Sequence, residues 1–164
     1  ITTSDISTLA NRRVWECAVL CNNAAIKNDL SNGPRFVGDT TEIGLLQAAR
    51  DRGFSRDDLL LQGCRRLLEV PFDSDRKMMS VVVWGTRGQT SWFGEGWEGA
   101  TLSKGAPESV LAKATRYLDA ATGEELPLTE AILTQVGDAQ SAFASQGLRV
   151  LAMAVTGITD PARQ

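Results

Sequence analysis

Three stretches of the chain repeat apolar residues at the spacing of an amphipathic helix. In residues 7 to about 26, apolar positions recur every three or four residues, which is the stripe that a helix packs against a core. The same spacing begins again after residues 38–42 and ends at Gly53. A third run lies in residues 128–146, and Gly147 can end it in a left-handed conformation. The pattern therefore predicts three amphipathic helices.

Turn and cap residues divide the remaining chain. Residues 28–35 carry turn chemistry and are expected to separate the first two helices. Ser55 can cap a short helix. Pro107 can open another helix, which we expect to run through Leu118, because proline at the first helical position loses no needed hydrogen bond. Residues 119–125 then read as a polar loop.

Alternating or β-branched residues predict the strands. Residues 66–72 alternate, and Pro71 places the end of this strand at a sheet edge or a bulge. Residues 76–84 form the most β-prone run, so the two strands read as a hairpin. Residues 100–104 and 148–155 are two further strands. The predicted fold class is α+β, with a twisted, mainly antiparallel β-sheet flanked by helices, and residues 1–164 are expected to form one domain.

Composition narrows the function classes. The chain has 164 residues, a formal charge of -3, three cysteines and no histidine. A slightly negative charge does not favour binding to nucleic acid. Because there is no histidine, Ser-His-Asp and Cys-His catalysis are excluded. No metal site is expected. No apolar run approaches the roughly eighteen residues of a membrane helix, so we expect the piece in hand to be soluble.

Several side chains allow both an ordinary and a functional interpretation. Lys104, between a strand and a helix, is either a solvated lysine or a point charge suited to phosphate. Phe72 is either a core residue or a ring near a frayed strand end on which a purine can stack. Glu42 is either part of a helix start, after an N-cap at residues 39–41, or a hydrogen-bond acceptor for a base. Arg149 is either paired across the sheet or directed at a ligand.

Trp92 and Trp97 offer a different kind of function. Two tryptophans in a glycine-broken stretch can dock a protein partner, although aromatic side chains packed across hairpin strands are an ordinary alternative. The rival hypothesis is a non-catalytic protein-interaction module that uses this loop.

Four ordered stretches decide between these interpretations: residues 38–42, 71–80, 104–108 and 147–152. Together they resemble the nucleotide-binding domain of P-type cation-transporting ATPases, and Lys104-Gly105-Ala106-Pro107-Glu108 is similar to that family's signature, with a calcium-pump-like leaning. The resemblance implies an ATP-binding set in which Glu42 contacts the adenine amino group, Phe72 stacks on the base, Lys77 reaches the base or ribose, Arg149 reaches the phosphates and Leu151 lines the adenine pocket. Thr41, Lys104 and Gly105 complete the set.

The resemblance also implies the wider function. Such a domain carries ATP and delivers its γ-phosphate to an aspartate in a separate phosphorylation domain, which drives cation transport. The piece is then expected to bind ATP without hydrolysing it, with Mg²⁺ held mainly by the other domain. Phosphorylation and transmembrane domains of the same polypeptide are the implied partners, at the cytosolic face of a membrane. Calcium is favoured over magnesium or monovalent cations.

Overall fold

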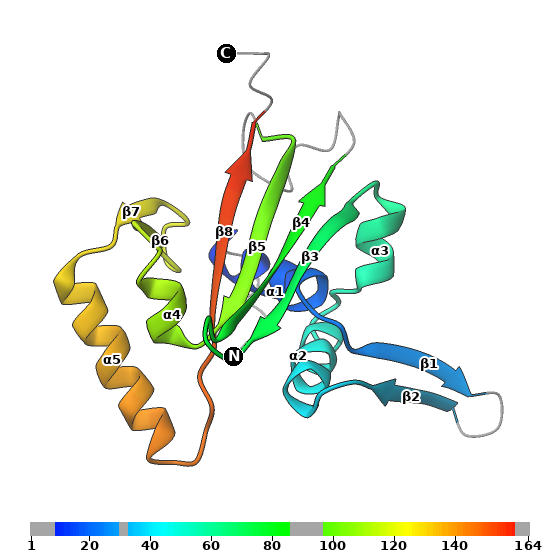
Figure 1. Cartoon of the computed structure of the whole chain (residues 1–164), viewed down its shortest axis with the longest axis horizontal. Helices are drawn as coiled ribbons and strands as arrows, with labels where there is room; N and C mark the ends of the chain where they lie inside the picture. The colour runs from blue at the N-terminus through cyan, green and yellow to red at the C-terminus, as the bar shows by residue number, and fades with distance from the viewer. Residues whose placement is uncertain (1–8, 30–32, 86–96, 160–164) are drawn as a thin grey trace.

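A four-stranded antiparallel sheet forms the centre of the molecule (Figure 1). The computed structural model describes residues 9–29, 33–85 and 97–159. The sheet has the order β3-β4-β5-β8, with β3 at one edge and β8 at the other. Its strands are β3 (Arg65–Asp73), β4 (Met78–Trp84), β5 (Gly99–Gly105) and β8 (Ala152–Ile158). The predicted α+β class with a mainly antiparallel sheet is confirmed.

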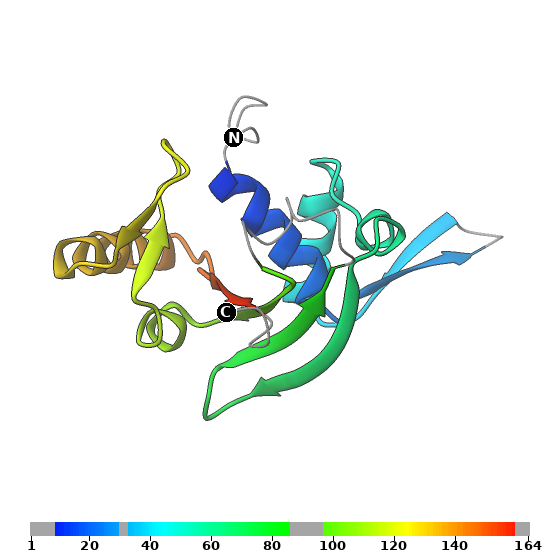
Figure 2. The ribbon, with the colours of Figure 1, turned by 90° about the horizontal axis from the view of Figure 1, so that it is seen from above.

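The core lies between one face of this sheet and three helices. Helix α1 (Leu9–Leu20) crosses that face, as Figure 2 shows, with α2 (Thr40–Arg50) and α3 (Arg56–Leu61) beside it. The helices contribute buried residues such as Val19, Leu20 and Leu46, which cluster with Val81, Val83 and Leu102 of the sheet. Burying each such side chain fully contributes roughly 1.5–3 kcal/mol. The core therefore fixes the ends of α2 and β5 relative to each other.

The structure confirms the caps predicted at residues 39–41, Ser55, Pro107 and Gly147, and it shows a further cap at Thr129. The side chains of Asp39, Ser55 and Thr129 accept hydrogen bonds from the first-turn N–H groups of α2, α3 and α5 (Glu130–Ala144). Pro107 opens α4 (Pro107–Leu111). Gly147, with φ of 73°, lies just beyond the end of α5.

The first helix is shorter than predicted. It ends at Leu20, and the chain continues into β1 (Ala25–Asp29), which pairs with β2 (Gly33–Val37) where a turn was expected. The buried Asn22 explains the early end. Its Nδ2 donates to the carbonyl of Ala18 at 2.9 Å, and its Oδ1 accepts the N–H of Ala24 at 2.8 Å. These bonds replace the next helical bonds and turn the chain away.

Two other element boundaries also differ from the prediction. Helix α4 ends at Leu111 and not at Leu118, because the following residues pair as a small hairpin of β6 (Arg116–Leu118) and β7 (Glu125–Pro127). The last strand runs from Ala152 to Ile158 instead of over residues 148–155. It pairs with β5 along the whole of that strand, so β5 sets its length.

Helix α5 lies to one side of the sheet, next to α4 and the β6–β7 hairpin (Figure 1). None of its residues is buried, although its sequence has the apolar spacing of a core helix. Within the described ranges, no helix combines the length and the apolar composition that crossing a bilayer requires.

The tryptophan loop is described only in part. Trp92 lies outside the described residues. Trp97 packs against the core cluster, and its ring lies so close to Gly157 that a Cβ at that glycine would collide with it. Trp97 therefore has a structural role in covering β8.

Candidate functional site

A cleft of about 810 Å³ opens at the end of the sheet where β3 turns into β4 and β5 leads into α4. The N-terminal end of α2 and the segment between α5 and β8 contribute its other walls. The structure brings all eight residues of the predicted set to this cleft: Thr41, Glu42, Phe72, Lys77, Lys104, Gly105, Arg149 and Leu151. The volume falls within the range of small-molecule sites.

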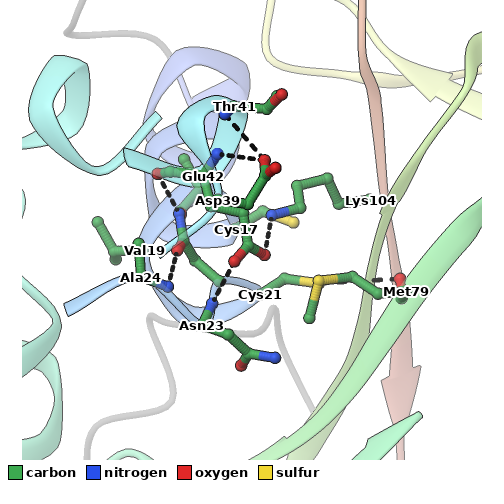
Figure 3. Close-up of polar contacts among 12 residues, drawn as sticks. Cys17, Val19, Cys21, Asn23, Ala24, Asp39, Thr41, Glu42, Met79 and Lys104 are labelled. Carbon is green, nitrogen blue, oxygen red and sulfur yellow. Dashed lines mark hydrogen bonds and ion pairs between the residues drawn. The ribbon is translucent and has the colours of Figure 1, made fainter. Parts of the chain in front are cut away.

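Glu42 and Lys104, which both line the cleft, form a nearly buried ion pair (Figure 3). The Nζ of Lys104 is 3.0 Å from Oε1 of Glu42, and their side chains are 7% and 16% exposed. Lys104 belongs to β5, so the interpretation of a solvated lysine at the strand end is wrong. Each partner satisfies the charge of the other in a site that water reaches poorly.

The residues after α1 hold Glu42 in place. Its Oε2 accepts the N–H of Asn23 at 3.2 Å, and its main-chain carbonyl accepts Nδ2 of Asn22 at 2.9 Å. Arg66 in turn donates to the side chain of Asn23 at 2.7 Å and to the carbonyl of Asn22 at 3.1 Å. Both carboxylate oxygens of Glu42 therefore have a donor, and the carboxylate is fixed before any ligand arrives.

The ring of Phe72 is 58% exposed, so the interpretation as a core residue is wrong. Phe72 lies on the edge strand β3, within the irregular pairing between Val70 and Asp73 that Pro71 predicted. The carboxylate of Asp73 closes the following turn by accepting the N–H groups at positions 75 and 76, at 3.0 and 2.9 Å. The turn thus presents an apolar ring at the mouth of the cleft.

Lys77 lies in this turn, immediately before β4, and not at the start of the strand as expected. Its φ is 53°, which is rare for a residue with a side chain. Its carbonyl accepts the N–H of Ala106 at 3.0 Å. A Cβ at Gly105 would collide with that carbonyl and lie 2.5 Å from the Cβ of Met78. Glycine at position 105 therefore permits the close approach of the two segments.

Arg149 and Leu151 lie in the segment that enters β8, outside the strand itself. Arg149 is exposed, so the interpretation as an arginine paired across the sheet is wrong. The N–H groups of Thr41 and Glu42 hold the pKa of the Asp39 carboxyl below its usual value, and the charge of Arg149 acts in the same direction. Arg149 and Asp39 both line the cleft.

Five further polar residues line the cleft that the predicted set did not include: Asn23, Asp39, Ser74, Glu108 and Gln140. Asp39 and Glu108 lie inside the sequence stretches that carried the prediction, and this was the available signal. Asp39, Glu42 and Glu108 together place three carboxylates among the cations of the lining. The charged lining residues are Asp39, Glu42 and Glu108 against Lys77, Lys104 and Arg149, so the formal charges cancel.

These residues suit a flat heteroaromatic ring that carries an anionic tail. The ring of Phe72 and the side chain of Leu151 are apolar, and the cations of the cleft can meet phosphate oxygens. The three carboxylates are already engaged: Asp39 caps α2, Glu42 binds Lys104 and Glu108 binds Lys77. Among the described residues, no group of three or more His, Cys, Asp or Glu is placed to hold a metal ion.

Comparison with known proteins gives a consistent result. A family model described as the cytoplasmic domain N of P-type ATPases matches residues 11–163. A calcium-transporting ATPase of Listeria monocytogenes is 35% identical over 146 residues, which are 86% of this chain and 14% of the relative. A calcium-transporting ATPase of Bacillus cereus is 36% identical over 143 residues, covering 87% of this chain and 14% of the relative. One from Saccharomyces cerevisiae is 28% identical over 141 residues, with 86% and 13% covered. The chain thus spans only a small part of the length of these curated relatives.

Proposed function

The chain belongs to the P-type ATPases as their cytoplasmic domain N, and on that premise we propose that its cleft binds the adenosine part of ATP. The observation that carries the proposal is the convergence of Phe72, Glu42 and the cations of the cleft on one cavity of about 810 Å³. The eight residues come from four separate stretches of the chain, so the fold brings them together.

Each wall of the cleft has a part in adenosine recognition. Phe72 supplies a platform for the purine, and stacking of a base on an aromatic ring is worth about 1–3 kcal/mol. Glu42 accepts a hydrogen bond from the adenine amino group, beside Thr41. Leu151 covers the base from the segment before β8. The fixed carboxylate favours a base that carries an amino group at this position.

The phosphates extend toward Lys104 and Arg149. We propose that Lys77, which the resemblance implied at the base or ribose, also reaches them, because it lines the same cleft. Lys104 is bound to Glu42, and the lining carries as many carboxylates as cations, so the field of the cleft attracts a polyphosphate only weakly. We expect a binding free energy on the order of -4 to -5 kcal/mol, roughly millimolar. Weak binding suits a domain that must both load and release its nucleotide.

The chain covers 14% of the length of the Listeria and Bacillus cereus relatives, so the wider activity is proposed for a longer protein. In that protein, this domain brings the γ-phosphate of ATP to an aspartate in a phosphorylation domain. Phosphoryl transfer then depends on positioning and charge neutralisation, and Mg²⁺ is held mainly by that other domain. Transmembrane domains of the same polypeptide move the cation, which we propose to be calcium because the relatives are calcium-transporting ATPases.

A nucleotide titration of the ¹⁵N-labelled chain tests this function. Amide shifts that saturate with ATP and concentrate at Phe72, Lys77 and Lys104 are expected, with no release of phosphate by the chain alone. If these amides stay unmoved while ATP is raised to saturating concentrations, the proposed function is wrong. Phosphate release by the isolated chain would instead indicate an independent hydrolase.

A further inference from the structure

The backbone of Lys77 is fixed by its neighbours on both sides. Its N–H donates to the carbonyl of Asp73 at 2.7 Å, and its carbonyl accepts the N–H of Ala106 at 3.0 Å. Gly105 lies against the same carbonyl, which leaves no room for a side chain there. These contacts hold the backbone of Lys77 in its left-handed conformation, with φ of 53°. The ammonium group extends into the cleft from a defined point.

The side chain of Lys77 forms an ion pair with a carboxylate of α4. Its Nζ is 3.2 Å from Oε1 of Glu108, in the first turn of α4, and the two side chains are 55% and 56% exposed. The pKa of Glu108 is lowered, first by its own backbone N–H at the start of the helix and then by Lys77. Glu108 is consequently ionised at neutral pH and forms an ion pair with Lys77.

The two ion pairs of the cleft differ in how easily they open. Lys104 and Glu42 are nearly buried, and Glu42 is fixed further by Asn23. Lys77 and Glu108 face water, where an ion pair is worth little and exchanges readily. A phosphate group entering the cleft can therefore displace Glu108 from Lys77 much more easily than it can displace Glu42 from Lys104.

We propose that Glu108 is a specificity-determining residue that competes with nucleotide phosphate for Lys77, and so lowers the affinity for ATP without changing the affinity for adenosine. This inference rests on the proposed function of the cleft. Two observations support it. Glu108 pairs with Lys77, and Ala106, two residues before Glu108, holds the backbone of Lys77 in place. Displaced from Lys77, the carboxylate stays in the cleft and repels the phosphates.

The test compares ATP and adenosine binding to the chain and to Glu108→Gln by amide-shift titration. We expect the variant to bind ATP about two- to fivefold more tightly, the range that corresponds to an exposed ion pair, with adenosine affinity unchanged. The gain should shrink as salt is added, because salt screens exposed charges. Glu124→Gln removes the same charge from an exposed position outside the cleft lining, and its ratio of ATP to adenosine affinity should match that of the wild type.

The background variant Lys77→Gln distinguishes two effects of Glu108: competition with phosphate for Lys77, and direct repulsion of the phosphates. In that background, Glu108→Gln should lose most of its gain, since the cation for which the carboxylate competes is gone. An unchanged or reduced ATP affinity of Glu108→Gln in the otherwise unaltered chain would overturn the inference, because it would mean that Glu108 only orients Lys77. If the wild type binds ATP at Phe72 and Lys104, such a result leaves the proposed function intact. Failure of the wild type to bind ATP there would overturn both.

Discussion

Removing one partner of the Glu42–Lys104 pair should destabilise the chain by an amount that depends on which partner is removed. At the observed 3.0 Å, the attraction is about 5.5 kcal/mol for an effective dielectric constant of about 20. Desolvating two nearly buried ions costs several kcal/mol, so the intact pair contributes little net stability. The free energy change on mutation is therefore set by the charge that stays behind.

Glu42→Gln leaves an ammonium group in a side chain that is only 7% exposed. The loss should be about 3 kcal/mol, at the lower end of the range for a stranded buried charge. Lys104→Met keeps the apolar stem and leaves a carboxylate that still accepts the N–H of Asn23 at 3.2 Å and lies at the start of α2. Its loss should be about 1 kcal/mol. The double variant strands neither charge, so its loss should be no larger than that of Lys104→Met.

Urea unfolding of the three variants and the wild type at neutral pH measures these differences. Lys113→Met, at an exposed position after α4, is the matched control and should change stability by less than about 0.5 kcal/mol. A loss for Lys104→Met that equals or exceeds that of Glu42→Gln would refute the reasoning. So would additive losses in the double variant.

Three more outcomes follow from the geometry of the cleft. Phe72→Ala should weaken ATP and adenosine binding equally, by about 1–3 kcal/mol in parallel titrations, with little change in stability because the ring is 58% exposed. Gly105→Ala should lower the unfolding free energy by about 1–3 kcal/mol, whereas Gly137→Ala, in open space on α5, should raise it by about 0.5–1 kcal/mol; equal effects would contradict the proposed close approach. The lowered folded-state pKa of Asp39 adds stability that is present above its unfolded pKa and is lost as the pH falls through the folded pKa. Between about pH 5 and about pH 2, the urea midpoint should therefore fall further for the wild type than for Asp39→Asn, and parallel curves would count against this role.

The sequence predicted correctly those helix starts that depend on residues close by in the chain. Asp39 and Ser55 mark helix starts through side-chain bonds to nearby N–H groups, and Pro107 fixes the start of α4 through its own ring. The boundaries that failed depend on partners distant in sequence or on competing bonds. Residues 116–118 become a strand only because residues 125–127 pair with them, and the start of β8 is set by β5.

The site shows the same division. Eight residues of the cleft could be predicted from four short motifs, and all eight line one cavity. Their pairing could not, because no sequence pattern states that Lys104 is buried against Glu42 or that Glu108 binds Lys77 across the turn. The exposure of Phe72 depends on the irregular edge of β3, where Pro71 gave a local signal.

The most direct test of adenosine binding in the cleft is a set of intermolecular nuclear Overhauser effects at saturating ATP. We expect contacts from the adenine H2 and H8 protons to the ring of Phe72 and to the methyl groups of Leu151. Adenine contacts to other surfaces of the chain, with none to Phe72 or Leu151, would contradict the central claim.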